Sequence, residues 1–398
     1  MRLTFFISVL LLFIVFITSC EDDPTSIGSN LLPGDDLIEF IELDSYNENL
    51  TQVSTYFQHD FTLGQSNRLL LGEADGLKAN TLIRFFIPIT TALGEKIDSN
   101  KVTILSAKVY LFPDYTFGKE NGQFGFDVYK VNSTWTVDSF TVADLYSLDY
   151  DAQNEADSIS ISDTLITFKV NPSLIYDWML AELDSNITDP NGFLLKPKED
   201  CERIFGFPAL SVSTSGETIM EISYEVTGEY VDTITATISS DVHVVEGSLN
   251  ETSEDIIVLQ AGIGVRGLLK FDMSSIPMNS IINDAILELK FDSTASSTGT
   301  VDANSIGVYM MRNYEEKTPL DTLGYYVLTR DGDTFSGKIS KFVQRWVYNT
   351  DNNGTPNEGL MLMIGGEENS VNKYILYGSQ VQDSALRPRL KIIYSRKL

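Results

Sequence analysis

The sequence predicts an all-β protein of two tandem β-sandwich domains with a jelly-roll-like arrangement. Beyond residue 50, apolar and polar residues alternate in short runs such as 107–112 and 285–291, which is the pattern of strands that bury one face. Clusters of Gly, Asn, Asp and Ser separate these runs, and helical periodicity is confined to about 173–183 and 339–348. Short strands in this proportion predict a sandwich or a jelly roll.

An internal repeat is the second observation, and it predicts two homologous domains. Segments of the first half match segments of the second in unbroken order: 82–85 with 268–271, 106–111 with 284–289, 126–129 with 306–309, 174–178 with 342–346, and 191–195 with 358–362. The offset falls from 186 residues at Phe85 and Phe271 to 170 residues at Tyr224 and Tyr394, as insertions and deletions in loops would produce. The predicted domains are 51–228 and 229–398, each of ordinary domain size.

The first twenty residues predict a lipoprotein signal peptide at 1–19. Arg2, an apolar run at 3–17 and the small residues after it are the parts of a secretory signal, and the run is too short to span a bilayer. The ending Ile-Thr-Ser-Cys at 17–20 resembles the bacterial lipobox. That resemblance implies lipidation of Cys20, with acyl chains such as palmitate holding the protein on a membrane. An ordinary signal peptide with an incidental cysteine is the alternative.

Residues 20–50 are predicted to be the lipidated cysteine followed by a flexible, acidic tether. The stretch is rich in Pro, Gly and acidic residues and has little periodicity. The acidic residues at 21–23 resemble the surface-export signal of Bacteroidota-type lipoproteins, and 27–36 resembles the mature start of one such family. The resemblance implies an outer-membrane protein exposed at the cell surface. A hydrated spacer explains the acidic residues equally well.

The repeat landmarks resemble the DNRLRE-type β-sandwich family. The second copy carries the landmarks in the family's order, at 269–272, 285–289, 343–346, 358–362 and 387–394. The first copy departs from the pattern, with Phe86 in place of the family's Asp and no Arg-Pro before its last strand. Only the first copy has the segment around Trp135. The resemblance implies a sandwich fold and carbohydrate binding, because family members include modules of polysaccharide-degrading enzymes that bind acidic glycans; other members belong to cell-surface proteins.

The net charge narrows the classes of partner. With 56 acidic and 28 basic side chains, the formal charge is −28. Nucleic-acid binding requires a surplus of Lys and Arg, and so does binding to anionic lipid through basic patches, so neither is expected. An acidic polysaccharide would need a local basic patch or a bridging cation.

Few residues are available for catalysis, and we expect no catalytic residues, no cofactor and no metal ligands. The chain has two His and two Cys and no Gly-x-Ser-x-Gly motif. His59 and Asp60 are adjacent, so their side chains would point to opposite faces of a strand. His59 and His243 are expected to have structural roles near the start of each domain. Cys201, among acidic residues, is expected to be a semi-buried and unreactive thiol without a disulfide partner.

Acidic clusters leave two alternatives open. Glycosidase chemistry needs two carboxyl groups at a defined separation, which a sequence does not reveal. Turn-like clusters at 149–157, 331–333 and 351–354 could supply oxygen ligands to calcium, but none has EF-hand spacing. Solvated turns explain most of these residues.

Aromatic residues make up 11% of the chain and suit either sandwich cores or sugar binding. Trp178 and Trp346 occupy equivalent positions in the repeat and are expected to be core residues. Trp135 has no equivalent in the second copy, and it is the candidate ligand-binding residue. The triplets at 163–165, 232–234 and 321–323 resemble Bacteroidota O-glycosylation sites, although chance explains them about as well.

These observations predict a non-catalytic, outer-membrane-anchored lipoprotein that acts as a surface binding or adhesion module for carbohydrate. The alternative is a structural or assembly lipoprotein that binds another envelope protein. A polysaccharide-degrading enzyme is the third hypothesis. The expected partners are the membrane, through the lipid anchor, and a glycan or an envelope protein.

Overall fold

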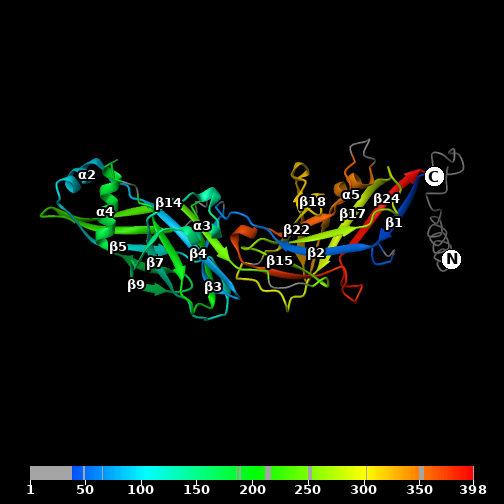
Figure 1. The fold of residues 1–398 in the computed structure, drawn as a ribbon, viewed down its shortest axis with the longest axis horizontal. Coiled ribbons are helices and arrows are strands. Elements are labelled where there is room, and N and C mark those ends of the chain that lie inside the picture. The colour runs from blue at the N-terminus through cyan, green and yellow to red at the C-terminus, as the bar shows by residue number, and fades with distance from the viewer. Residues whose placement is uncertain are drawn as a thin grey trace, which may run out of the picture.

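The computed structural model describes residues 38–47, 50–64, 66–184, 186–187, 190–210, 217–249, 253–301, 303–348 and 354–397. The predicted signal peptide, Cys20 and most of the predicted tether lie outside these residues. The fold is nearly all β, with 50% strand and 13% helix in two large antiparallel sheets, which confirms the predicted fold class. Each sheet is continuous and folds around its own apolar core, so the chain forms two units (Figure 1).

Unit 1 comprises residues 68–246. Its elements are β3 (Arg68–Ala74), β4 (Leu77–Phe86), α2 (Thr91–Asp98), β5 (Val102–Leu111), β6 (Tyr115–Gly118), β7 (Phe126–Val131), η3 (Val137–Ser139), α3 (Val142–Ser147), β8 (Tyr150–Asn154), β9 (Ala156–Ile161), β10 (Ile166–Val170), α4 (Pro172–Leu183), β11 (Phe193–Pro197), β12 (Arg203–Pro208), β13 (Ile219–Val226) and β14 (Tyr230–Glu246). The strands run in the order β6-β12-β3-β4-β14-β13-β5-β10-β9, and β11 joins β4 to β7, which pairs with β8.

Unit 2 comprises residues 38–58 and 256–397. Its elements are β1 (Ile38–Asp44), β2 (Gln52–Gln58), β15 (Ile256–Gln260), β16 (Val265–Phe271), β17 (Ile281–Lys290), β18 (Ser305–Asn313), β19 (Thr318–Pro319), η4 (Asp321–Leu323), β20 (Tyr325–Asp331), β21 (Thr334–Lys338), α5 (Ser340–Val347), β22 (Leu360–Ile364), η6 (Glu367–Asn369), β23 (Lys373–Tyr377) and β24 (Arg389–Lys397). The order is β1-β24-β17-β21-β20-β18-β22-β16-β15-β23, with β2 on β16 and β19 on β18.

The strand pairing differs from the domain boundaries expected from the repeat. β1, within the predicted tether, pairs with β24, and β2, at the start of the predicted first domain, pairs with β16. β14, at the start of the predicted second domain, pairs with β13 and then with β4. Residues 38–58 therefore belong to unit 2, and residues 230–246 belong to unit 1.

The repeat explains this arrangement as an exchange of equivalent segments. β4 and β16 are equivalent in the repeat, as are β13 and β24. β14 pairs with both β4 and β13 in unit 1, and β1 and β2 together pair with β16 and β24 in unit 2. Each segment thus precedes one repeat in sequence and completes the other in space. The physical reason is local, because β13 and β14 form a hairpin through Gly228, whose φ of 74° suits glycine.

The two cores follow from the alternating patterns noted in the sequence. In β5 and β17, side chains at alternate positions point inward and are almost completely buried. α4 and α5, which confirm the two predicted helices, pack against β5 and β17. Trp178 and Trp346 are 4% and 9% exposed and lie in the two cores, as expected. Each fully buried Leu or Phe contributes roughly 1.5–3 kcal/mol.

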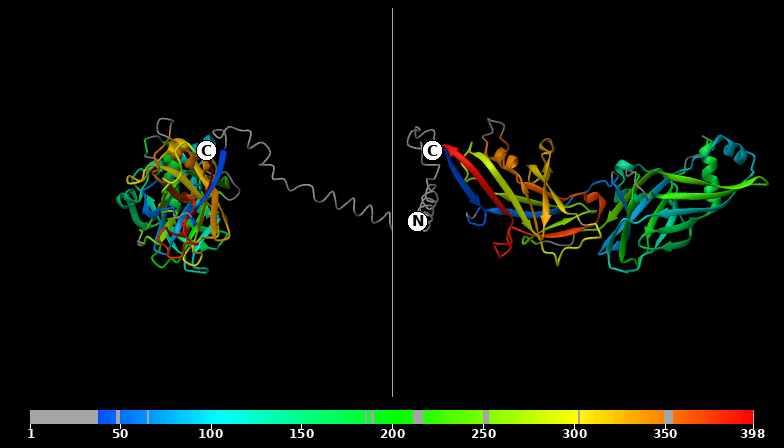
Figure 2. Two further views of the ribbon diagram at one scale, coloured as in Figure 1. Left: turned by 90° about the vertical axis from the view of Figure 1, so that its right-hand side faces the viewer. Right: turned by 180° about the vertical axis from the view of Figure 1, so that it is seen from behind.

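The units lie end to end, and buried contacts join them (Figures 1 and 2). One apolar cluster contains Tyr115 and Phe117 of unit 1 together with Ile263 and Val371 of unit 2. The hydroxyl of Tyr115 donates to Oδ1 of the fully buried Asn372 at 2.9 Å, and the backbone N–H of Val371 donates to the same hydroxyl. These contacts hold the units in one elongated body.

Candidate functional site

A cleft at the junction of the two units is the best candidate for a binding site. Its volume is about 390 Å³. Four segments line it: residues 58–63 after β2, the helix α3, the end of β14 from 244 to 247, and the turn between β15 and β16. Clefts between structural units are common ligand sites in proteins.

Trp135 positions one wall of this cleft instead of lining it. The side chain is 8% exposed, and its Nε1–H donates to the carbonyl oxygen of Asn191 at 2.8 Å. Phe140 packs edge-on against the indole, and the Arg84 guanidinium lies 5.2 Å from its centroid. Trp135 borders a separate polar hollow of about 280 Å³, but its indole offers no open face to a sugar. The geometry therefore gives no support to Trp135 as an exposed ligand-binding platform.

The segment that Trp135 holds, residues 132–149, covers the outer face of β4, β11 and β14. Trp135, Phe140 and Leu145 bury themselves against Leu194 and Val242 of that face. The helix α3 then begins with a capping box, in which the Thr141 backbone N–H donates to the Asp144 carboxylate and the Thr141 hydroxyl accepts from the Asp144 N–H. These contacts fix the start of α3.

Tyr146, on α3, presents the exposed aromatic ring of the cleft. Its side chain is 72% exposed, and its hydroxyl donates to Oε2 of Glu246 at 2.6 Å. That hydrogen bond raises the pKa of Tyr146. The other oxygen of Glu246 accepts from Nδ2 of the fully buried Asn80 at 2.7 Å, so the carboxylate is held at the end of β14. The ring is thus oriented by a chain of hydrogen bonds that begins inside unit 1.

His59 and Asp60 supply polar groups on the opposite wall. Both are exposed, and the backbone N–H of His59 donates to the carbonyl oxygen of Gly264 at 2.9 Å, which ties this wall to unit 2. Although His59 is exposed at the surface, partial desolvation of its ring and the nearby Arg266 lower its pKa, which favours the neutral imidazole at pH 7. Within the described part of the chain, the Asp60 carboxylate makes no hydrogen bond or ion pair.

The two histidines do not occupy equivalent positions. His243 lies within β14 opposite Thr81, whose counterpart in the repeat is Gly267, and Gly267 lies opposite Tyr56. His243 is completely buried, which lowers its pKa to about 3, and neither ring nitrogen has a partner among the described residues. It is a neutral core residue, as expected, whereas His59 lies in the exposed cleft.

The remaining residues singled out in the sequence give no reactive centre. Cys201 is half-buried, its thiol donates to the carbonyl oxygen of Gly125 at 3.0 Å, and burial raises its pKa, which agrees with the expected inert thiol. Among the described residues, no three His, Cys, Asp or Glu side chains are grouped so that they could hold a metal ion. Thr164, Thr233 and Thr322 of the three triplets are exposed.

The sequence offered little signal for Tyr146 and Glu246. Tyr146 follows a recognisable capping pattern, but its exposure depends on how α3 packs, and Glu246 reaches it only because β14 pairs with β4.

No helix in the described ranges is long and apolar enough to span a membrane. No family model, curated protein or solved structure matches the chain.

Proposed function

We propose that this protein is a non-catalytic, lipid-anchored surface protein of the outer membrane that binds neutral carbohydrate in the junction cleft. The observation that supports the proposal most is the exposed Tyr146 ring, hydrogen-bonded to Glu246, in a cleft of about 390 Å³ whose other wall carries Asp60. The lipobox-like sequence ending at Cys20 supports the anchor.

Carbohydrate suits the mixed chemistry of the cleft. A sugar has an apolar C–H face that packs on an aromatic ring, and hydroxyls that donate to carboxylates. Tyr146 offers the ring, Asp60 offers an acceptor, and the neutral imidazole of His59 can donate or accept. Val142, Ala143 and Ile263 complete the lining with apolar surface.

The charge of the cleft favours a neutral ligand over an acidic one. Asp60 and Glu246 line it, and its described lining contains no Lys or Arg. A uronate or sulfate group would be repelled there unless a cation accompanied it. The acidic ligands of the family that the repeats resemble are therefore not the ligands proposed for this chain.

Glycan binding to the unacylated chain from residue 21 tests the proposal. We expect neutral oligosaccharides to be retained on an array and Tyr146→Ala to raise their Kd about tenfold, equivalent to about 1.4 kcal/mol. Tyr325→Ala is the matched control, because Tyr325 is 58% exposed on unit 2 and does not line the cleft. Absence of binding to every neutral glycan, or equal loss in both variants, would contradict the proposal.

A structural or assembly role is the second candidate, and exposed apolar residues at the far end of unit 1 favour it. Tyr230 and Val231 are 44% and 61% exposed and follow the turn of the β13–β14 hairpin, which belongs to the unit farther from β24 (Figure 1). A photo-crosslinker at Val231 would capture one dominant envelope protein in cells if this role applies, and no specific product if it does not.

A further inference from the structure

An exposed apolar surface lies at the end of unit 2 where the described chain begins and ends. Its four side chains are Ile38 and Phe40 of β1, Ile281 of β17 and Ile393 of β24, which we call the terminal apolar face. They are 59%, 70%, 59% and 39% exposed, respectively. The residues between them on β1 and β24 that point inward, such as Ile392 and Tyr394, belong to the core of unit 2.

The strand register places these side chains on one face of the sheet. Phe40 lies opposite Ser395, and Ser395 lies opposite Ile281, so the three form one row across β1, β24 and β17. Ile38 is two residues from Phe40 on the same strand, and Ile393 is two residues from Ser395, so both point to the same side. Within this face Ser395 lies between Phe40 and Ile281, and Ile393 lies between Glu42 and Asp284, so the apolar side chains share the face with polar ones.

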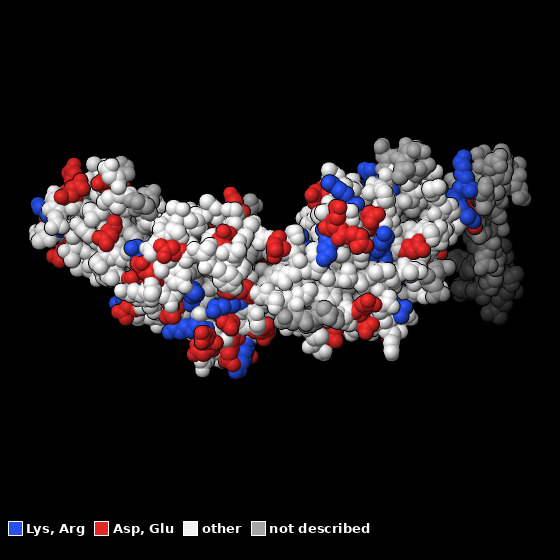
Figure 3. Space-filling view, viewed as in Figure 1, with Lys and Arg blue, Asp and Glu red and all other residues white. Residues whose placement is uncertain are grey.

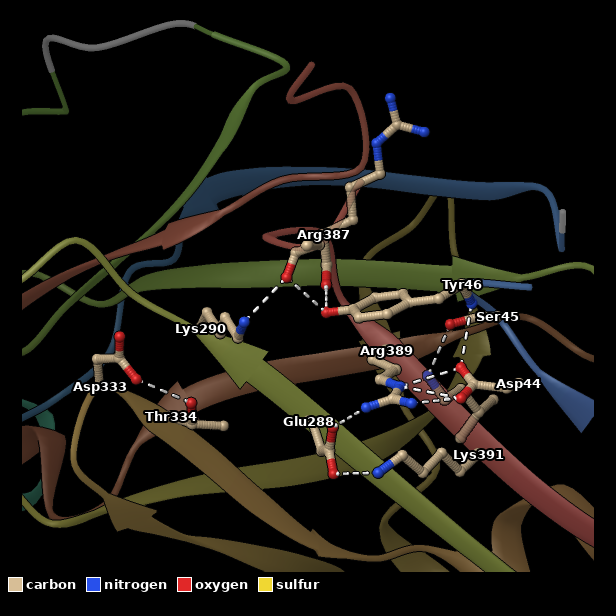
Figure 4. A network of polar contacts seen from close by, with 12 residues as sticks. Asp44, Ser45, Tyr46, Glu288, Lys290, Asp333, Thr334, Arg387, Arg389 and Lys391 are labelled. Atoms are coloured by element: carbon tan, nitrogen blue, oxygen red, sulfur yellow. Dashed lines mark hydrogen bonds and ion pairs between the residues drawn. The ribbon is translucent and has the colours of Figure 1, made fainter. Parts of the chain in front are cut away.

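Charged side chains lie beside this face, further from the chain ends. Further along the same strands, Nε of Arg389 donates to Oδ1 of Asp44 at 3.0 Å, and Glu288 accepts from Lys391 at 2.9 Å (Figure 4). The apolar residues thus occupy only the last part of the sheet. On the opposite side of this end, Arg396 pairs with Glu39, and Figure 3 shows Lys and Arg side chains at this extremity.

The chain outside the described structure connects to this face. Ile38 lies opposite Lys397, so both described termini are at this end (Figure 2). Residues 21–37 separate the proposed anchor at Cys20 from Ile38, and seventeen residues span at most about 60 Å. An anchor at Cys20 would therefore hold this end of the body, which carries the terminal apolar face, nearest to the bilayer.

We propose that the terminal apolar face rests on the lipid bilayer to which Cys20 is anchored, which orients the elongated body away from the membrane. The contact is shallow, because β1 is an edge strand with unpaired backbone groups and Glu42 follows Phe40 by two residues. Burial of exposed apolar side chains at the interface supplies the attraction. This inference rests on the proposed lipid anchor.

Fluorescent labels on the acylated full-length protein in phosphatidylcholine vesicles test this contact. In a Cys201→Ser background, an environment-sensitive dye is attached to Phe40→Cys, Ile281→Cys, Tyr325→Cys or Tyr230→Cys. We expect bromine-labelled lipid to quench the dye at positions 40 and 281 at least threefold more than at 325 and 230. Equal quenching at all four positions would overturn the proposal.

Two further outcomes separate this inference from the anchor itself. Failure of the unlabelled acylated protein to float with vesicles would contradict the anchor, whereas flotation without quenching at position 40 would contradict only the contact. A dye at position 40 that is shielded from both lipid and aqueous quenchers would mean that residues 21–37 cover the face, which also overturns the proposal. Ile281→Asp should leave flotation unchanged and reduce the quenching at position 40.

Discussion

The two units are the same sandwich completed in different ways, and the difference shows that a sequence repeat is not necessarily a folding unit. Unit 1 obtains its closing strand, β14, from the adjacent hairpin with β13, so all its strands are continuous in the chain. Unit 2 obtains the equivalent strands, β1 and β2, from the other end of the chain. A hairpin closes with little loss of loop entropy, and β1 is left to complete unit 2.

The outer faces of the units differ as well. In unit 1, eight buried residues, among them Trp135, fill the space between the sheet and the segment 132–149. Among the described residues of unit 2, Phe57, Leu268, Met311 and Met361 alone form the buried cluster in the equivalent place. The larger cover of unit 1 carries α3 and so creates the wall of the junction cleft that bears Tyr146.

The largest effect is expected from removing residues 21–58. Unit 2 would lose β1 and β2, which pair with β24 and β16. Its total free energy of unfolding is of the order of 5–15 kcal/mol, so losing two strands should remove hydrogen-exchange protection throughout the unit. Unit 1 should keep its protection. A chain that lacks only residues 21–37 is the control and should behave as the intact protein. If unit 2 kept full hydrogen-exchange protection without residues 38–58, then β1 and β2 would not be needed for its stability.

Trp135→Ala is expected to destabilise unit 1 by about 3–5 kcal/mol, because it leaves a cavity beneath the cover of its outer face. Urea unfolding followed by hydrogen exchange of peptides from each unit measures the effect. Met361→Ala, in the smaller cover of unit 2, should cost about 2 kcal/mol and leave unit 1 unchanged. Equal costs would mean that the larger cover adds no stability.

Acid stability distinguishes the units through His243 and its neighbour Asp241. Burial lowers the pKa of His243 to about 3, whereas its pKa in the unfolded chain is about 6.5. Its contribution to the free energy of unfolding is therefore complete above about pH 6.5 and is lost as the pH falls, by about 1.4 kcal/mol per pH unit. Burial raises the pKa of Asp241 to about 6, so its contribution is complete below about 3.8 and is lost as the pH rises. Between pH 4 and 6 the two slopes oppose each other.

His243→Phe removes one of these slopes. Unit 1 of the variant should therefore lose stability as the pH rises from 4 to 6, by about 1.4 kcal/mol per pH unit relative to the parent. Unfolding curves across this range measure the difference. His59→Asn, at the exposed histidine, is the control. A variant whose pH dependence matches the parent would show that His243 is not held neutral by burial.

The smallest effect is expected from Asp44→Asn. Asp44 accepts from Arg389 and so joins β1 to β24, a contact that unit 1 does not need because a turn links its equivalent strands. The hydrogen bond lowers the pKa of Asp44, so its contribution is present above about 3.8 and lost as the pH falls. We expect unit 2 to lose about 1 kcal/mol at pH 7 and unit 1 to lose none. A comparable loss in unit 1 would contradict this assignment.

Much of the fold could be predicted from local pattern. Alternation of apolar and polar residues predicted strands such as β5 and β17, and the repeat predicted that Trp178 and Trp346 are buried in equivalent places. The candidate site was not predictable in the same way. Trp135 was singled out because it lacks a counterpart, and that difference marks a structural cover, whereas the exposed ring belongs to Tyr146 eleven residues later.

The sequence by itself determined that the chain is all-β and predicted from its repeat that Trp178 and Trp346 lie in equivalent cores, because side-chain period and composition are local properties. Only the tertiary structure decided which copy the first two strands complete, because β1 and β2 meet β24 and β16 only by pairing with segments distant in the chain. It also decided where the cleft lies, since the segments that form its walls are distant in the chain and meet only when the two units pack together.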